Sequence, residues 1–165
     1  MNLELIRNTI TSEINPILSN NDGTKLSSVL IIIFEDSPKI LMIKKPITMK
    51  HHGGEIAFPG GKISNDDEDL LDTAIRETLE ETGIKVKRDE VIGQLKPVTT
   101  LNSGFTILPF ICILDEIKNL TPNSEVDEFL EIPLMPFLQT LAEDSIPEHN
   151  SIQEMYELRF KNHII

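Results

Sequence analysis

The chain has 165 residues, of which 39% are hydrophobic, so it is long enough for one domain with a buried core. Its formal net charge of −12 argues against general binding to nucleic acids or anionic membranes, because both require a basic surface. Its single cysteine, Cys112, excludes a disulfide within the chain, which favours a reducing compartment. Cys112 lies in an apolar run, where a buried core thiol is more common than a nucleophile.

No sequence segment predicts export or membrane insertion. Glu4 is acidic and no long apolar stretch follows it, unlike a signal peptide. The longest apolar run, Ile107–Leu114, is too short to span a bilayer. We therefore expect a cytoplasmic protein, a monomer or homodimer, with neither nucleic acid nor membrane among its partners.

The first part of the chain predicts one helix and then a β-hairpin. Four apolar residues recur at helical spacing: Leu3, Ile6, Ile10 and Ile14. They predict a helix of about four turns over residues 3–18, before a polar loop at Ser19–Thr24. A β-branched run predicts a strand over Ser28–Phe34, and Lys39–Lys45 predicts a second strand that returns from a turn.

An amphipathic helix follows a loop over residues 46–54 and a short strand over Glu55–Phe58. Asp66 or Asp67 can cap its start, and Gly83 suits the left-handed position just after its end. The apolar face of the helix can pack on a core and consists of Leu71, Ala74, Ile75 and Thr78.

The rest of the chain predicts mainly strands. They are expected over Val91–Leu95, Phe105–Leu114, Glu125–Ile132 and Met155–Phe160. A polar loop is expected at Thr99–Gly104 and a second helix at Leu134–Ala142. Pro109 within the long strand indicates an edge strand or a bulge. Several strands around one central helix predict a mixed α+β fold, with helices packed on a sheet.

Three carboxylates, those of Glu77, Glu80 and Glu81, share one face of the central helix, because residues three and four apart are neighbours. They repel one another, so stability does not explain them, whereas a hard cation bound through oxygen does. Arg76 lies beside them and can hold the carboxylates in place through its fork of donors. The alternative is a solvated acidic helix, but Glu77 and Glu80 have no Lys or Arg four residues further on, and Lys85, which follows Glu81 at that spacing, comes after the expected helix end at Gly83.

Charge is distributed unevenly around the glycine turn that precedes this helix. Lys39–Lys62 contains five Lys and one Glu, a net charge of +4, whereas Ser64–Glu81 contains eight acidic residues and one Arg, a net charge of −7. Adjacent basic and acidic segments suit an anionic ligand held partly by a metal. Gly60 and Gly61 could form a plain turn, but bare glycine backbone also lets a carbonyl oxygen approach a cation.

This pattern resembles the Nudix box, in which a glycine is followed at fixed spacing by Arg-Glu-x-x-Glu-Glu-x-Gly and an apolar residue. The second half matches directly, at Arg76, Glu77, Glu80, Glu81, Gly83 and Ile84. In the first half, Asp67 has the usual spacing from Gly61 and Glu68 the usual spacing before Arg76, so one extra residue separates the halves. That variant is typical of the coenzyme A diphosphatase branch of the family.

Three further stretches are similar to that branch: His52–Gly61, Ser103–Phe110 and Glu125–Leu134. The spacing holds across residues 28–140. The sequence departs from the branch at three positions, with Lys50 in place of Arg, Glu55 in place of Gln and Ser64 in place of Asp. These departures bear on the substrate more than on the fold.

The resemblance implies an α/β/α sandwich with a mixed sheet over residues 25–165, after an N-terminal helix and loop over residues 1–24. It also implies hydrolysis of a nucleoside diphosphate linkage with Mg²⁺ or Mn²⁺, most directly in coenzyme A or an acyl derivative, to 3′,5′-ADP and 4′-phosphopantetheine. ADP-ribose, NADH or an oxidised nucleoside triphosphate are alternatives in the same class, and a nucleotide-sensing module without catalysis is the alternative outside it. In the family a Trp-Gly-x-Thr-Ala segment that opens a last helix follows a stretch like the end of this chain, so we expect a shortened domain or a naturally short end.

The resemblance further implies roles for individual residues. The expected metal ligands are Glu77, Glu80, Glu81 and the carbonyl of Gly61. The expected catalytic residues are Arg76, Glu77, Glu80, Glu125 and Glu128, of which the last two could instead be solvated loop residues. The expected substrate-binding residues are Lys44, Lys45, Lys50, His52, Phe58, Gly60 and Gly61. The three lysines could hold the 3′-phosphate of coenzyme A or, like Lys62, be ordinary surface residues, and His52 could simply cap its loop.

Overall fold

The computed structural model describes residues 2–10, 12–18, 23–50, 52–100, 103–143 and 156–165. Within them the α-helices are α1 (Leu3–Thr9), α2 (Leu70–Thr82) and α3 (Leu134–Leu138), with a short 3₁₀ helix at Arg88–Glu90. The longer strands are β1 (Lys25–Phe34), β2 (Lys39–Lys44), β7 (Phe105–Leu114) and β8 (Glu128–Pro133). The shorter ones are β3 (Ile56–Ala57), β4 (Gly60–Lys62), β5 (Val91–Gln94), β6 (Val98–Thr99), β9 (Ala142–Glu143), β10 (Tyr156–Glu157), β11 (Arg159–Phe160) and β12 (His163–Ile164).

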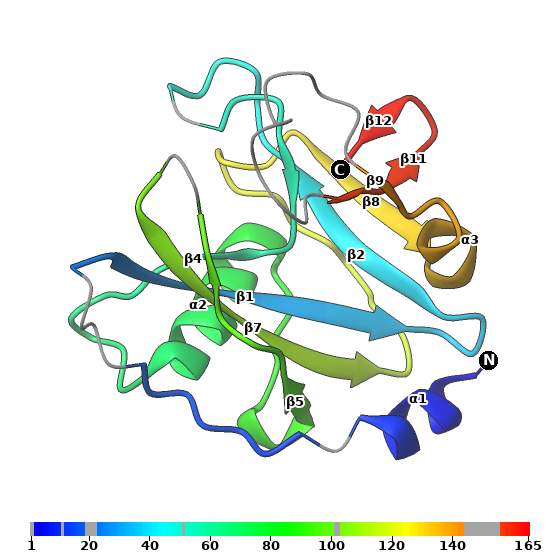
Figure 1. Ribbon diagram of the computed structural model, residues 1–165, viewed down its shortest axis with the longest axis horizontal. Coiled ribbons are helices and arrows are strands. Elements are labelled where there is room, and N and C mark those ends of the chain that lie inside the picture. Colours follow the sequence, from blue (N-terminus) through cyan, green and yellow to red (C-terminus); the bar gives the residue numbers. More distant parts are fainter. Residues whose placement is uncertain (1, 11, 19–22, 51, 101–102, 144–155) are drawn as a thin grey trace.

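The predicted hairpin of β1 and β2 is present, but its two strands pair only next to the turn, where Ile33 and Phe34 face Ile40 and Lys39. Beyond that point β2 diverges from β1 (Figure 1). The first part of β1 pairs with β4 instead, while β2 pairs with β3 and β8. The divergence matters for function because both cavities described below are lined by residues of β4, which pairs with β1, and by Lys45, which directly follows β2.

β7 lies beside β1 along its whole length, since all ten residues of β1 pair in parallel with it. Its other edge pairs with β5 and β6 in antiparallel fashion. β7 is therefore an inner strand, and the edge position expected from Pro109 is wrong. Pro109 lies opposite the break between β5 and β6, where its carbonyl accepts a hydrogen bond from the backbone N–H of Leu95. A residue without an N–H is tolerated there because the neighbouring ladder is interrupted.

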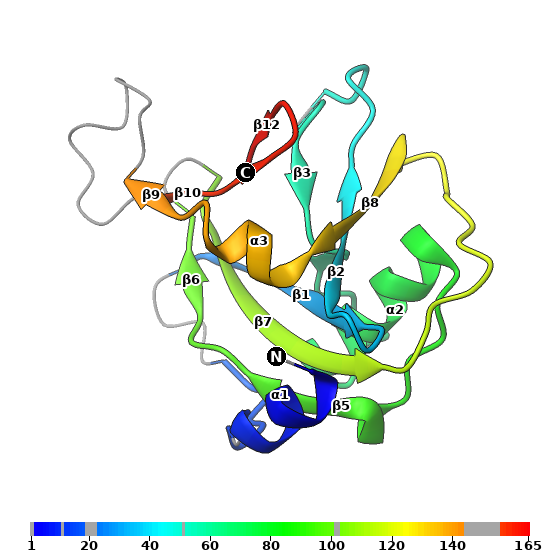
Figure 2. The same cartoon turned by 90° about the vertical axis from the view of Figure 1, so that its right-hand side faces the viewer.

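Helices cover both faces of this mixed sheet. On one face α2 packs over alternating residues of β1 and β7, among them Leu30, Ile32 and Phe110. On the other face α1 and α3 pack over Ile33 and Ile113. Figure 2 shows α2 and α3 on opposite sides of the strands. The predicted α+β class and α/β/α sandwich are confirmed.

The N-terminal helix is shorter than predicted and ends at Thr9. Its helical spacing was misleading because the apolar residues serve two different cores: Leu3 packs on the α1 and α3 side of the sheet, whereas Ile14 packs on the α2 side. After Thr9 the chain follows β5, where the Ser12 hydroxyl accepts a hydrogen bond from the backbone N–H of Gln94. Contacts with the sheet thus replace the helical hydrogen bonds.

The caps of α2 agree with the prediction at one end only. Gly83 ends the helix in the left-handed conformation, with φ of 77°. At the start, the N-cap is Asp69, whose side chain accepts hydrogen bonds from two backbone N–H groups of the first turn. The predicted caps Asp66 and Asp67 are wrong, and the side chain of Asp67 is bound by Arg76 instead.

The second predicted helix also ends early, at Leu138 instead of Ala142. The Thr140 hydroxyl bonds to the carbonyl of Phe137, and the chain then turns into β9. His51, Met155, residues 19–22 of the loop predicted at Ser19–Thr24 and residues 101–102 of the loop predicted at Thr99–Gly104 lie outside the described residues. None of the described helices is long and apolar enough to cross a bilayer.

Candidate active site

Glu81, in the last turn of α2, is the most buried of the predicted site carboxylates, with a side chain that is 1% exposed. Its Oε2 accepts a hydrogen bond from the backbone N–H of Gly60 at 2.9 Å. Its Oε1 is buried and accepts a hydrogen bond from no described residue. The nearest cation is the ammonium of Lys45, whose Nζ lies 3.7 Å from Oε1. Burial raises the pKa of Glu81 to about 7, although Gly60 and Lys45 act in the opposite direction.

Gly61 lies against the carboxylate of Glu77, one turn before Glu81 on α2. A Cβ atom at position 61 would lie 2.4 Å from the carboxyl carbon of Glu77, so any larger residue there would displace this carboxylate from its observed position. The carbonyl of Gly61, a predicted metal ligand, accepts a hydrogen bond from Oγ of Ser27 at 2.6 Å. A carbonyl oxygen has two lone pairs, so this bond leaves one for a cation.

Arg76 holds the acidic side chains with separate parts of its guanidinium. Nε and Nη2 donate to the two carboxylate oxygens of Asp67 at 2.8 and 2.9 Å. Nη1 donates to Glu77 at 2.8 Å and, over a longer distance of 3.4 Å, to Glu80. The hydrogen bonds from Arg76 lower the pKa of Asp67 to about 2. The expected contact between Arg76 and the carboxylates is therefore present, and it orients Glu77.

The carboxylates do not form one prearranged metal cluster. The side chain of Glu80 is 53% exposed, and within the described residues no group of three or more His, Cys, Asp or Glu is arranged to hold a metal ion. Two features nevertheless fit a divalent cation. The buried Oε1 of Glu81 lacks a hydrogen-bond donor among the described residues, and the backbone of Gly61 closely approaches Glu77. Oxygen donors of this kind suit Mg²⁺ or Mn²⁺.

A cavity of about 420 Å³ opens beside these groups. Glu77, Glu80 and Glu125 contribute its acidic side chains, and Lys45 and Lys62 contribute its basic ones. Glu125 comes from the loop before β8 and is close enough for its charge to contribute to the raised pKa of Glu81. The cavity therefore combines carboxylates that suit a cation with ammonium groups that suit phosphate oxygens.

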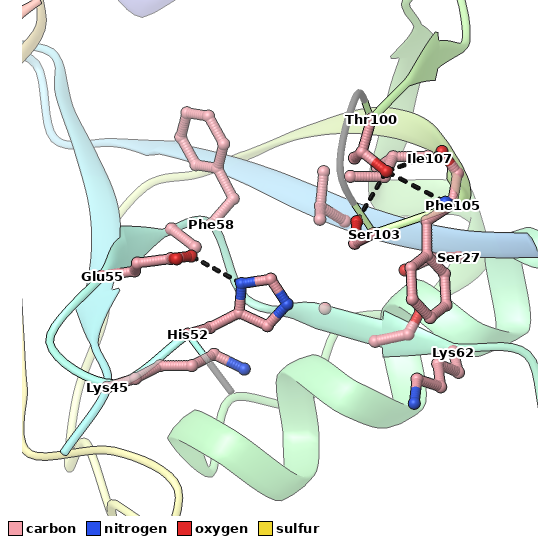
Figure 3. Close-up of a pocket in the computed structure, with 14 residues that line it drawn as sticks. Ser27, Lys45, His52, Glu55, Phe58, Lys62, Thr100, Ser103, Phe105 and Ile107 are labelled. Carbon is pink, nitrogen blue, oxygen red and sulfur yellow. Dashed lines mark hydrogen bonds and ion pairs between the residues drawn. The ribbon is translucent and has the colours of Figure 1, made fainter. Parts of the chain in front are cut away.

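A second cavity, of about 300 Å³, adjoins the first. The two share Lys45, His52, Gly60, Gly61 and Lys62. Figure 3 shows Lys45 and His52 reaching in from one side, with Lys62 and Phe105 on the other. Nδ1 of His52 lies 2.8 Å from Oε2 of Glu55, and its other ring nitrogen faces away from Glu55 (Figure 3). Phe58 and Phe105 contribute apolar side chains to the lining of this second cavity.

Five of the predicted residues line neither cavity: Arg76 and Glu81, whose contacts are described above, and Lys44, Lys50 and Glu128. Lys44 lies on the opposite face of β2 from Lys45, because side chains alternate along a strand. It forms an ion pair of 3.9 Å with Glu128, its partner in the register of β2 and β8. Lys50 is exposed in the loop after β2. Substrate binding by Lys44 and Lys50 and catalysis by Glu128 therefore gain no support from the geometry.

The cavities also contain residues that the sequence did not identify. Lys62 directly follows Gly60 and Gly61, and this position in the sequence could have indicated that it belongs to the site. Thr100 and Ser103 come from the loop between β6 and β7, and Phe105 is the first residue of β7. The sequence predicted a polar loop and a strand here and a similarity to the family branch from Ser103 on, but it assigned these residues no role in the site. Ser27 reaches Gly61 through the pairing of β1 with β4, for which spacing along the sequence gives no signal.

Comparison with known proteins gives a family and a fold. The sequence matches the NUDIX domain family over residues 24–155. The structure is similar to the crystal structure of a MutT/nudix family protein from Enterococcus faecalis, with a TM-score of 0.62 and 15% sequence identity, over 90% of this chain and 52% of that chain. At that level of identity the likeness concerns the fold alone.

Two curated relatives are more similar in sequence. The uncharacterized Nudix hydrolase NudL of Photorhabdus laumondii is 33% identical over 116 residues, which are 69% of this chain and 62% of the relative. The mitochondrial coenzyme A diphosphatase NUDT8 of Mus musculus is 44% identical over 92 residues, which are 54% of this chain and 43% of the relative. The matched part of the chain thus spans between 43% and 62% of the length of these relatives.

Proposed function

This chain belongs to the Nudix family, and from that premise we propose that it hydrolyses a diphosphate linkage in a nucleotide, with coenzyme A or an acyl derivative as the favoured substrate. The products from coenzyme A are then 3′,5′-ADP and 4′-phosphopantetheine. The cytoplasmic location and the monomeric or homodimeric state stay predictions.

One observation carries the proposal, namely an incompletely paired carboxylate beside a cavity that also contains lysines. Oε1 of Glu81 is buried without a described hydrogen-bond donor, at a cost that the fold does not recover. Lys45 and Lys62 line the adjoining cavity. A diphosphate that carries a divalent cation satisfies both groups, because the carboxylates bind the cation and the ammonium groups bind phosphate oxygens.

In this proposal Glu77 and Glu81 hold the divalent cation, with Glu80 and the Gly61 carbonyl as further ligands. When bound, the cation neutralises diphosphate charge and lowers the pKa of a water that attacks phosphorus. Arg76 keeps Glu77 in position through the 2.8 Å hydrogen bond from Nη1. Lys45 and Lys62 orient the phosphate oxygens of the substrate.

We propose Glu80 or Glu125 as the acceptor of the proton from water. Both line the first cavity, so both can approach a substrate bound there, whereas Glu128 does not line it. Glu80→Gln and Glu125→Gln separate the two candidates. The variant that lacks the base is expected to lose kcat. Glu125→Gln should keep its affinity for Mn²⁺, whereas Glu80→Gln should also bind Mn²⁺ more weakly because Glu80 is a proposed ligand. Equal turnover of both variants and the unmodified protein would exclude both residues.

The preference for coenzyme A is supported by the similarity to the diphosphatase from Mus musculus and by the lysines of the cavity. Coenzyme A carries a 3′-phosphate that ADP-ribose lacks, and that dianion requires cationic partners. Lys45 and Lys62 are the candidates that the geometry favours. We therefore expect a higher kcat/KM for coenzyme A than for 3′-dephospho-coenzyme A, and replacement of the responsible lysine by Ala should remove that preference.

The test is a hydrolysis panel with Mg²⁺ and with Mn²⁺, in which products are identified by mass. It contains coenzyme A, an acyl-coenzyme A, 3′-dephospho-coenzyme A, ADP-ribose, NADH and an oxidised nucleoside triphosphate. A preference for ADP-ribose, or equal efficiency on the two coenzyme A forms, would remove the coenzyme A assignment and leave a Nudix hydrolase. Binding of a nucleotide without any product would instead identify a sensing module.

A further inference from the structure

Lys45 is the counterion of Glu81, but the contact between them is incomplete. Nζ lies 3.7 Å from Oε1, which is within the range of an ion pair and too long for a hydrogen bond. The side chain of Lys45 is 18% exposed and that of Glu81 is 1% exposed, so the pair joins a buried carboxylate to a cation at the cavity wall. Gly60 satisfies the other oxygen of Glu81, so Lys45 is the cation that faces Oε1.

A divalent cation bound to Oε1 of Glu81 would take the side of the carboxylate that Lys45 now faces. Two positive groups at contact distance in a poorly solvated site repel each other strongly. The cation and the ammonium therefore compete for the same oxygen. Lys45 can withdraw because its ammonium is carried on a flexible four-carbon stem.

The cavities offer the displaced ammonium a second partner. Lys45 lines both of them, together with His52 and Lys62 (Figure 3). A diphosphate bound beside the cation places anionic oxygens in the same space. A lysine that leaves Glu81 can thus pair with the substrate instead of remaining uncompensated.

We propose that Lys45 is an exchangeable counterion: it faces Glu81 in the metal-free protein and transfers to the substrate diphosphate when a divalent cation takes Glu81. The proposal rests on the function proposed above, since it requires a cation at Glu81. It makes metal binding and phosphate binding mutually favourable, because each step frees the group that the other needs. Lys45 is then a substrate-binding residue that also lowers the affinity of the empty site for metal.

The test is the dissociation constant of Mn²⁺, measured by electron paramagnetic resonance at pH 8 without nucleotide. Lys45→Met removes the competing ammonium, so this variant should bind Mn²⁺ about tenfold more tightly than the unmodified protein. Lys44→Met is the matched control, because it removes the same charge from the neighbouring residue on the opposite face of β2, beside Glu128. Its dissociation constant should stay within about twofold of the unmodified value, since the ammonium of Lys44 faces Glu128 and not Glu81.

Two additional variants keep the test decisive if Met at position 45 does not fold. Lys45→Gln is neutral and polar and should also tighten Mn²⁺ binding. Lys45→Arg keeps the charge and should keep the weaker binding of the unmodified protein. A further readout is the KM for coenzyme A at saturating Mn²⁺, which should rise in Lys45→Gln because the ammonium no longer reaches the phosphates.

The outcomes distinguish this inference from the function on which it rests. If the neutral variants at position 45 bind Mn²⁺ no more tightly than Lys44→Met, while the unmodified protein binds Mn²⁺ and cleaves a nucleotide, the exchange is excluded and the hydrolase stands. If the unmodified protein neither binds Mn²⁺ nor cleaves any nucleotide of the panel, the proposed function fails.

Discussion

Two carboxylate–cation pairs, Asp67 with Arg76 and Glu81 with Lys45, involve residues of α2 and differ in their hydrogen bonding and in the direction of their pKa shifts. The side chains of Asp67 and Glu81 are both buried, at 4% and 1% exposed. Asp67 accepts two short hydrogen bonds from Arg76, and its pKa is lowered to about 2. Glu81 accepts one hydrogen bond from a backbone N–H, faces Lys45 at 3.7 Å, and its pKa is raised to about 7.

The difference is the one that we expect between a structural carboxylate, Asp67, and the proposed cation ligand, Glu81. Desolvation of a carboxylate is offset only when its lone pairs receive hydrogen bonds, as those of Asp67 do. Glu81 is desolvated without that compensation, so it destabilises the metal-free protein. A buried, incompletely paired acid beside a cavity is what a cation-binding residue requires before its cation arrives. The following predictions test this comparison, from the largest expected effect to the smallest.

Glu81→Gln should abolish most of the activity and leave the fold intact. Loss of the charged ligand removes charge neutralisation and water activation, each worth several kcal/mol, so kcat should fall by several orders of magnitude. The control is the free energy of unfolding at pH 8, which should not fall, because a neutral amide is easier to bury than an unpaired carboxylate. Near-normal turnover that still requires metal would contradict the role of Glu81.

The stability of the metal-free protein should fall as pH rises from about 4.5 to about 7 because of Glu81. Its raised pKa means that the folded state holds this proton more tightly than the unfolded chain does. The contribution is therefore complete below the unfolded pKa and is lost as pH rises through about 7. It amounts to a loss on the order of 3 kcal/mol. Urea unfolding in EDTA between pH 5 and 8 should show this fall, and Glu81→Gln should lack much of it; an identical fall in both proteins would contradict the assignment.

Asp67→Asn should act in the opposite way and destabilise the fold. It leaves Arg76 without its main partner, at a cost of about 2 kcal/mol, less than for a fully buried pair because Arg76 is 29% exposed. The lowered pKa of Asp67 gives stability that is present above its unfolded pKa and is lost as pH falls through about 2. Urea unfolding at pH 7 measures the loss, and an unchanged midpoint would show that the pair is not structural.

Arg88→Met should have the smallest effect. Arg88 pairs with Asp69 and Asp72 at the start of α2, but its side chain is 47% exposed. Pairs of this kind contribute less than about 1 kcal/mol because water screens them. In the same urea experiment, the free energy of unfolding of Arg88→Met should therefore be close to that of the unmodified protein. A loss as large as that of Asp67→Asn would show that the difference in burial between Asp67 and Arg88 does not decide how much their ion pairs stabilise the fold.

The sequence predicted the elements that depend on local chemistry. The hairpin of β1 and β2, the apolar face of α2 and the left-handed Gly83 all follow from patterns within a few residues. Contacts between residues far apart in the sequence explain the wrong predictions. The N-terminal helix is shorter than predicted because Ser12 bonds to the edge of β5. The predicted N-cap of α2 is wrong because Asp67 binds Arg76 instead of the first turn of the helix.

The candidate site was predictable as a set of residue types but not as an arrangement. Helical spacing placed Glu80 and Glu81 together, yet one is exposed and the other buried, because only the tertiary fold brings Gly60 to Glu81. Strand alternation shows that Lys44 and Lys45 face opposite sides, but it does not tell which side has the cavity. The divergence of β1 and β2 determines on which side the cavities lie, and no local sequence pattern predicts this divergence.

The most direct measurement is a titration of the carboxyl groups by ¹³C NMR, with labelled Glu and Asp, in EDTA and then in saturating Mg²⁺. The account predicts that Glu81 titrates near 7 in the metal-free protein and at a clearly lower pH with Mg²⁺, while Asp67 stays near 2 in both. A Glu81 carboxyl that titrates near its ordinary value of 4.5 and does not respond to Mg²⁺ would contradict the assignment of this residue to a cation site.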